Sequence, residues 1–310
     1  MALNYAETYS PELLEILMQG ALTSPFVTDN VRWLDAKTFH FTQMSTSGYK
    51  NHKRDGGWNR GSYAQTDIPF TVTHDRDVEF LVDKAEVDET NKTASIQNIS
   101  RVFEQTQVVP ETDALFFSKV AAAAKKVDGY HSETAATAYT VDNTFSKLKK
   151  CLSAGKLRRY KANGTLIMYV TSAIMDNLES SKEFTRKIEM TQIAEGGLGI
   201  ETRVTDIDGV PIMEVIDDER FYDEFNWEPS NGGFEAKTGA HKINVLIACG
   251  QTCKTVPKIS SIYFFDPGVH TLGDGYLYQN RSLSDVFVFP NGRDGKVDSV
   301  YVDTDTVAVV

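Results

Sequence analysis

Residues of the types that support covalent catalysis do not form a recognisable motif in this chain. The G-x-S-x-G string of nucleophilic hydrolases is absent, as are the phosphate-binding strings G-x-x-x-x-G-K-S/T and G-x-G-x-x-G. His131 does precede Ser132, but a catalytic triad requires side chains that meet in space, and neighbours in sequence rarely point at one another. We therefore expect a surface loop over residues 129–133 and predict no catalytic residue.

Paired carboxylates offer the second kind of chemistry. The runs Asp217-Asp218-Glu219 and Asp303-Thr304-Asp305 have the residue types that glycoside hydrolysis needs. The chain carries 43 acidic residues, however, and acidic side chains are ordinarily solvated. A β-rich carbohydrate-active enzyme that uses Asp217, Asp218 or Glu219 is the alternative from a different functional class.

Metal ligation is weakly represented. Cys249 and Cys253 form a C-x-x-x-C pair without a second Cys or His cluster, and none of the six histidines has the i, i+4 spacing of a helical metal site. Residues 291–298 resemble a calcium loop but lack its acidic spacing, so we expect a tight turn there. An odd count of three cysteines suits a reducing compartment. We predict no metal and no cofactor.

Length and composition exclude further classes. The chain has 310 residues, of which 41% are hydrophobic, so it is long enough for a sizeable core and more than one domain. It contains no apolar run of about 18 residues, which predicts no membrane span, and its first residues do not resemble a signal peptide. A net charge of -11 argues against a protein whose main task is gripping nucleic acid, although it permits enclosing it.

Among the predicted structural elements, a hairpin arm carries a long polar segment at its tip. Residues 37–44 and 66–82 have β character, and between them lies STSGYKNHKRDGGWNRGSYAQ, which is glycine-rich, charged and nearly free of aliphatic residues. A loop this long is uncommon inside a compact domain, so we expect it to have a partner. Its mixture of basic and aromatic residues suits a protein interface, with nucleic-acid binding as the alternative. The residues predicted for this contact are Tyr49, Lys50, Lys53, Arg54, Trp58, Arg60 and Tyr63.

A short amphipathic helix is predicted near the N-terminus, where Ser10 can cap it and Pro11 occupies the first helical position. This segment is too small to hold a core, so its apolar face needs a partner surface. That face comprises Leu13, Leu14, Leu17 and Met18.

The remaining chain alternates helices and strands. Helical periodicity covers residues 91–126 and is interrupted at Pro110, which predicts a long helical element that is kinked or broken there; a further helix over 141–154 has Asp142 as its expected cap. We predict strands at 164–171 and 241–248, a helix at 172–180, a hairpin turn at Asp208-Gly209, and several strands from residue 259 onward. The fold class that follows is α+β.

Three stretches in this order resemble the major capsid proteins of tailed bacteriophages. The first is VFEQTQVVPETDA (residues 102–114) followed by FSK (117–119), which is similar to that family's spine helix. The second is the strand over 210–215 that runs into the acidic turn ending at Arg220, and the third is GYLYQNR (275–281) with DVFV (285–288) and a last strand near 300–302.

The resemblance implies the capsid fold shared with encapsulins and the herpesvirus capsid floor. It assigns 1–35 to an N-terminal arm, 36–84 to the extended loop, 85–135 to the spine-helix part of a peripheral domain, 136–258 to an axial domain, and 259–310 to strands returning to the peripheral domain. Because the arm starts almost at once, a separate scaffolding protein is expected rather than a cleaved leading segment.

The function implied is self-assembly through homo-hexamers and homo-pentamers into an icosahedral shell. The shell would enclose double-stranded DNA without sequence-specific binding and would include a portal. Assembly is expected in the host bacterial cytoplasm, and the product is the virion capsid. An encapsulin-type compartment shell is the alternative with the same fold.

Overall fold

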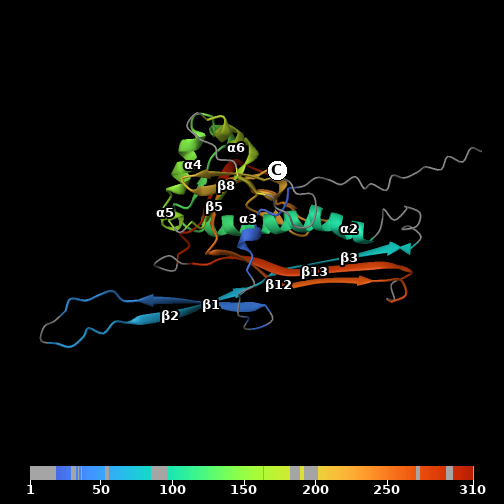
Figure 1. Cartoon of the computed structure of the whole chain (residues 1–310), viewed down its shortest axis with the longest axis horizontal. Helices are drawn as coiled ribbons and strands as arrows, with labels where there is room; N and C mark the ends of the chain where they lie inside the picture. The colour runs from blue at the N-terminus through green and yellow to red at the C-terminus, as the bar shows by residue number, and fades with distance from the viewer. Residues whose placement is uncertain are drawn as a thin grey trace, which may run out of the picture.

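The computed structural model describes residues 19–28, 33, 35, 37–52, 56–84, 96–162, 164–181, 189–191, 202–269, 273–290 and 296–309. These form a seven-stranded sheet, a long three-stranded sheet, a helix that contacts both, and a hairpin that projects from one side (Figure 1). The helical elements are η1 (Ser24–Phe26), α2 (Ile96–Phe103), η2 (Glu104–Val108), α3 (Val109–Lys125), η3 (Ala136–Ala138), α4 (Thr144–Leu152), α5 (Arg158–Lys161), α6 (Ser172–Glu179) and η4 (Asp218–Arg220). The strands are β1 (Thr38–Thr46), β2 (Tyr63–Thr71), β3 (His74–Asp83), β4 (His131–Glu133), β5 (Leu166–Thr171), β6 (Glu189–Thr191), β7 (Thr202–Ile207), β8 (Val210–Val215), β9 (Phe225–Asn226), β10 (Glu235–Ala236), β11 (His241–Cys249), β12 (Cys253–Phe265), β13 (Gly275–Val288) and β14 (Tyr301–Ala308).

The seven-stranded sheet has the order β4-β14-β11-β5-β8-β7-β6 and is covered on both faces. Alternate side chains of β5 serve two cores: Met168 and Val170 pack with α4 and α6, whereas Tyr169 packs with α3. A strand buried on both faces has no solvated side to mark with polar residues, which is why LIMYVT is almost continuously apolar.

The three-stranded sheet has the order β12-β13-β3 and is entirely antiparallel. One face packs against the helix formed by α2, η2 and α3, which we call the spine helix. Phe80 of β3 meets Phe103 edge to face with ring centroids 5.3 Å apart, and Asn280 Nδ2 of β13 donates to Glu104 Oε1 at 2.9 Å. Because Tyr169 of β5 packs with α3 on its other side, the spine helix contacts both large sheets.

The spine helix runs through Pro110 without the predicted interruption. A proline inside a helix lacks the N–H that would bond to the carbonyl four residues earlier. Here η2 is a π-helical segment, in which Val109 N–H donates to Glu104 O, so the ladder widens before the proline. Within it, the Thr106 hydroxyl donates to Val102 O at 2.8 Å. The local change of hydrogen bonding accommodates the ring.

Two short-range predictions are corrected. Helix α4 begins at Thr144, and Asp142 does not cap it; Asn143 precedes the helix, and its Oδ1 accepts a hydrogen bond from Thr140 N at 3.0 Å. Residues 131–133 form a strand rather than a surface loop, because β4 pairs in parallel with β14.

The C-terminal part is β-rich as predicted, with two differences in arrangement. The predicted strands around 276–288 are one strand, β13, and the run 66–82 divides into β2 and β3, which belong to different sheets. Strand β14 pairs with β11 in the seven-stranded sheet, whereas β12 and β13 pair with one another and β13 with β3. The domain boundaries stay a prediction.

Candidate functional surface

Two of the three acids in the first run considered for glycoside hydrolysis have structural partners. Asp217 accepts from Arg220 Nη2 and from Gln19 N, the latter at 3.0 Å, and Asp218 pairs with Lys242. Their arrangement fits ion pairing within the chain rather than two carboxylates facing a substrate.

Asp303, from the second acidic run, is fully buried in the seven-stranded sheet. It accepts from Ser132 Oγ, from Thr134 Oγ1 at 2.7 Å and from Tyr139 Oη at 2.7 Å. Burial, followed by the neighbouring Asp303 carboxylate, raises the pKa of Tyr139, so its phenol remains a donor. This network satisfies a buried carboxylate and fixes β4 against β14.

A second buried network joins residues far apart in the sequence. Asp113 of α3 and Arg220 of η4 are both fully buried, and Arg220 Nη1 donates to Asp113 Oδ2 at 2.9 Å. The Asp113 carboxylate also accepts from Leu22 N, Thr23 N and Thr23 Oγ1, the last at 2.6 Å. Burial raises the pKa of Asp113, and the Arg220 guanidinium and these donors oppose that rise. The network ties residues 19–23 to the spine helix.

The hairpin of β1 and β2, which we call the arm, has no core of its own along most of its length. Its strands pair antiparallel from Thr38↔Thr71 to Thr46↔Tyr63, and they pair only with each other among the described strands. Most of their side chains are exposed. The predicted hairpin is confirmed, and Figure 1 shows it reaching away from both large sheets.

The arm tip comprises residues 47–62 and is held by local contacts. Ser47 N donates to Ser62 O at 2.8 Å, and Asn59 Nδ2 donates to Asn51 O at 2.8 Å. Within the described part of the tip, these bonds and that from Lys50 Nζ to Arg60 O connect tip residues only with one another.

The predicted contact residues of the arm are fully displayed to solvent where the structure describes them. Tyr49 is 110% exposed, Trp58 94% and Tyr63, at the start of β2, 76%. Lys50 and Arg60 lie beside them and are exposed. Lys53 and Arg54 of the same prediction lie outside the described residues, as do Leu13, Leu14, Leu17 and Met18 of the predicted N-terminal helix.

At its root, the arm is packed against the body by aromatic side chains. Phe39, which is 2% exposed, lies 5.6 Å from the ring of Phe70 and 5.1 Å from that of Phe287. Phe41 stacks on Phe289 with centroids 4.6 Å apart. Apolar packing therefore holds one end of the arm and leaves the other end free.

A second group of exposed apolar side chains lies at the far end of the three-stranded sheet and is spread over both of its faces, since Phe264 shares the spine-helix face with Tyr278 and Phe80 whereas Leu81 and Tyr263 lie on the opposite face. Its members are Leu81, Ile262, Tyr263, Phe264 and Val269, each between 47% and 71% exposed. Asp77 and Glu79 are also exposed on β3 close by. Large exposed aromatics grouped on one sheet end mark an interaction surface more often than isolated ones do. In Figure 1 this end and the arm tip lie at opposite ends of the described strands.

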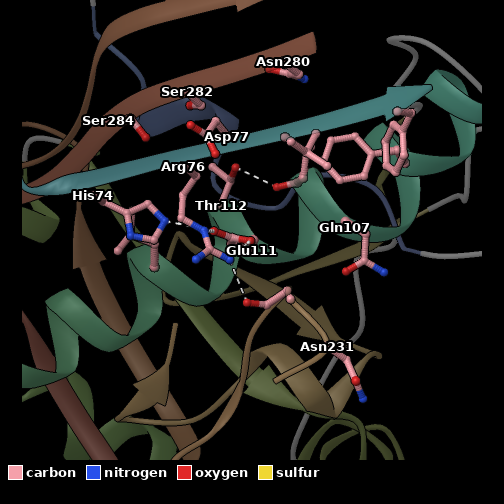
Figure 2. Close-up of a pocket in the computed structure, with 17 residues that line it drawn as sticks. His74, Arg76, Asp77, Gln107, Glu111, Thr112, Asn231, Asn280, Ser282 and Ser284 are labelled. Carbon is pink, nitrogen blue, oxygen red and sulfur yellow. Dashed lines mark hydrogen bonds and ion pairs between the residues drawn. The ribbon is translucent and has the colours of Figure 1, made fainter. Parts of the chain in front are cut away.

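A cavity of about 500 Å³ lies between the spine helix and the strands β3 and β13 (Figure 2). Arg76 Nε donates to Glu111 Oε1 at 2.8 Å, Arg76 Nη2 donates to Gly233 O at 2.7 Å, and His74 Nε2 lies 3.0 Å from Glu111 Oε1. Arg76 thus joins β3, the spine helix and the loop after β9. Its charged atoms are already engaged by the protein, so the described lining of the cavity offers a ligand no unpaired arginine.

The cysteines are free and buried, and the described residues contain no cluster of three or more His, Cys, Asp or Glu side chains that could hold a metal ion. Among the same residues, no helix is long and apolar enough to cross a membrane.

Comparison with solved structures decides the fold. The chain aligns with the mature capsid of bacteriophage PhiM1 at a TM-score of 0.63 and 13% identity, over 97% of this chain and 91% of that one. This chain has the fold of phage capsid proteins. A solved structure from Mycobacterium phage Che8 aligns at a TM-score of 0.61 and 13% identity over 97% and 98% of the two chains. The capsid structure of cyanophage P-SCSP1u aligns at 0.60 and 11% identity over 98% and 94%.

The predicted α+β capsid fold is therefore confirmed. No protein-family model matches the sequence, and the comparison with curated proteins returned no match. The likeness rests on three-dimensional arrangement, because identities of 11–13% preserve few individual residues.

Sequence reasoning missed the residues that hold the arm and residues 19–23 in place. Asp113 and Arg220 both stand in stretches that resemble the capsid family, but nothing in their spacing signals that they pair. The available clue was Asp113 at the start of the largely apolar helical run DALFFSKV, because a buried charge requires a partner.

Proposed function

We propose that this chain is a major capsid protein, a shell-building subunit of a tailed phage that works without an active site. The arm is the observation that carries the proposal. An isolated two-stranded hairpin is marginally stable in water and normally needs a further packing surface. This one exposes Tyr49, Trp58 and Tyr63 at its outer end, where the described part of its own chain offers no cover.

The partner surface belongs to a second copy of the chain. The arm tip is basic and aromatic, and the far end of the three-stranded sheet exposes aromatic and aliphatic side chains beside Asp77 and Glu79. Contacts between two different surfaces of identical subunits close into rings when the rotation between neighbours permits. Rings of six and of five subunits are then linked through many modest interfaces, and the binding free energies of these interfaces add up to a stable icosahedral shell.

The charge of the chain supports a container rather than a nucleic-acid clamp. At a net charge of -11, the wall avoids tight adhesion to packed double-stranded DNA. We infer assembly in the host bacterial cytoplasm with a separate scaffolding protein and a portal, and a final place in the virion capsid. Shell assembly of this kind needs no cofactor.

Deletion of residues 46–65 tests the proposal. The shortened subunit keeps both large sheets and loses inter-subunit contacts, so it is expected to remain folded and to build no closed shells. Circular dichroism reports the fold, and light scattering with negative-stain microscopy reports assembly, with and without the scaffolding protein.

The full-length chain is the control in both conditions. Shells, tubes or isolated capsomers from it support the capsid proposal, whereas a strictly monomeric species in both conditions would overturn it. Normal shells from the deletion variant would overturn the role of the arm alone. Turnover of a polysaccharide that is lost in a D218N/E219Q variant would instead favour the enzyme.

A further inference from the structure

Asp285 lies where three parts of the molecule meet. It is 1% exposed and sits in β13 immediately beyond Ser284, whose pairing with His74 is the last step of the β13–β3 ladder. The chain leaves the arm through Val72 and Thr73 at this same point, between the end of β2 and the start of β3.

The two oxygens of the Asp285 carboxylate serve different elements. Oδ2 accepts from Thr73 N at 3.0 Å and from Thr73 Oγ1 at 2.7 Å. Oδ1 lies 2.9 Å from Lys119 Nζ of the spine helix and accepts from Val286 N at 2.8 Å. The arm root and the spine helix are thus joined through one buried carboxylate.

We infer that Asp285 is a positioning residue that sets the angle at which the arm leaves the body. The aromatic side chains around Phe39 also hold the root, but apolar attraction has little directional preference. Hydrogen bonds fix direction, because they weaken steeply when the donor is misaligned. With Lys119 on one oxygen and Thr73 on the other, the arm takes its direction from the spine helix.

An Asn at this position cannot replace the carboxylate. If the amide oxygen accepts from Thr73, the amide nitrogen faces the Lys119 ammonium and the Val286 N–H, which are both donors; the flipped amide loses the Thr73 bonds instead. Lys119 is 39% exposed, so in D285N it can turn toward water and the fold can survive.

The chain offers a matched control on the same helix. Lys125 of α3 pairs with Asp223, which is 4% exposed and also accepts from His241 N at 2.7 Å. This Lys–Asp pair resembles the first in burial and geometry but joins the spine helix to β11 rather than to the arm. D223N therefore tests whether any loosening of the helix changes the arm.

Spin labels on the tip and the body measure the angle in the unassembled subunit. Gly48 has open space around its Cα, and Asp128 is exposed in the turn after α3, so G48C and D128C accept labels. The native cysteines are buried, and burial raises the pKa of Cys151 to about 11 and of Cys253 to about 12, which suppresses their reactive thiolates. The protein without G48C and D128C provides the labelling blank.

We expect one narrow distance distribution in the doubly labelled parent and in its D223N variant. In D285N we expect a distribution roughly twice as broad, because the amide can serve either Thr73 or Lys119 but not both, so the directed link between the arm root and the spine helix is broken while the apolar packing remains. K119A, which keeps Asp285 as the acceptor for Thr73, is expected to broaden it less. An unchanged distribution in D285N, or equal broadening in D223N, would overturn the inference.

The consequence for assembly rests on the proposed function. D285N subunits are expected to give irregular or open particles in negative stain where D223N subunits give shells like those of the parent. Uniform closed shells from D285N would overturn this consequence without touching the capsid proposal, which the 46–65 deletion tests separately.

Discussion

In the seven-stranded sheet, β11 buries seven of its nine side chains, whereas in the arm β1 buries only Phe39. The body hides even charged groups, since Asp113 and Arg220 are both fully buried and pair with each other. The arm exposes groups that the body would bury, with Tyr49 and Trp58 almost entirely in water.

The contrast separates interactions that stabilise the subunit from those available to a neighbour. Burial of apolar area and paired charges within the body contributes to folding. The exposed aromatic area of the tip contributes nothing to folding and becomes favourable only when another molecule covers it. The two regions should therefore respond in opposite ways to substitution, in stability for the body and in assembly for the tip.

The largest loss of stability is expected for R220M. It leaves the buried Asp113 carboxylate without its cation, and breaking a buried pair in this way costs about 3–5 kcal/mol. Urea unfolding of the unassembled subunit measures it, with K237M as the control because Lys237 and Glu224 are both 59% exposed. The stabilising role of the buried network would be contradicted if R220M shifted the urea midpoint of unfolding no more than K237M does.

A smaller loss is expected at the arm root. F39A removes a buried ring and should cost about 3 kcal/mol, since large-to-small changes lose transfer energy and leave a cavity. Met44, on the same strand and 64% exposed, provides the control M44A, because it lies outside the aromatic packing of the root. Limited proteolysis should cut the arm of F39A faster, and equal rates for both variants would show that the root is held in another way.

The turn of the β7–β8 hairpin should respond more weakly still. Gly209 has φ +77° and follows Asp208 at φ 54°, so G209A places a Cβ in the left-handed region and should cost about 1 kcal/mol. Gly48 in the arm tip would place a Cβ with no other atom within 4 Å and has no such backbone constraint, so G48A serves as the control. Thermal unfolding of both variants tests whether the tight turn, and not the wide tip, depends on its glycine.

The smallest effect on stability is expected at the tip itself. A Y49S/W58S variant should unfold within about 0.5 kcal/mol of the parent, as exposed substitutions do, yet form far fewer shells. V307S, at a residue of β14 that is 70% exposed, is the control for loss of exposed apolar area elsewhere. Equal shell yields from the two variants would remove the functional difference between tip and body.

Much of the architecture was predictable because short-range patterns are imposed by the backbone. Glycine-rich sequence between two β-like runs predicted the arm, Asp208-Gly209 predicted a tight hairpin turn, and the apolar runs at 164–171 and 241–248 predicted buried strands; all are present. One helix start was predicted wrongly: Asp142 was expected to cap the helix, but α4 begins at Thr144 and Asn143 directly precedes it.

The networks of buried polar groups were not predictable. Asp113 and Arg220 are 107 residues apart, and Thr73 and Asp285 are 212 apart, so nothing in the spacing of either pair indicates contact. The π-helical segment before Pro110 also escaped prediction, because a proline removes a donor from the α-helical ladder and nothing in the local pattern shows that the hydrogen bonding widens ahead of it.

By itself, the sequence determined the existence of the arm, the polarity of its tip and the α+β class, because turn residues, side-chain alternation and helical period act over a few residues. Only the tertiary structure decided which sheet receives β14, how the spine helix passes Pro110, and which buried carboxylates bind which cations. Those outcomes depend on desolvation and on directed hydrogen bonds between distant segments, and both arise only when the segments are packed together.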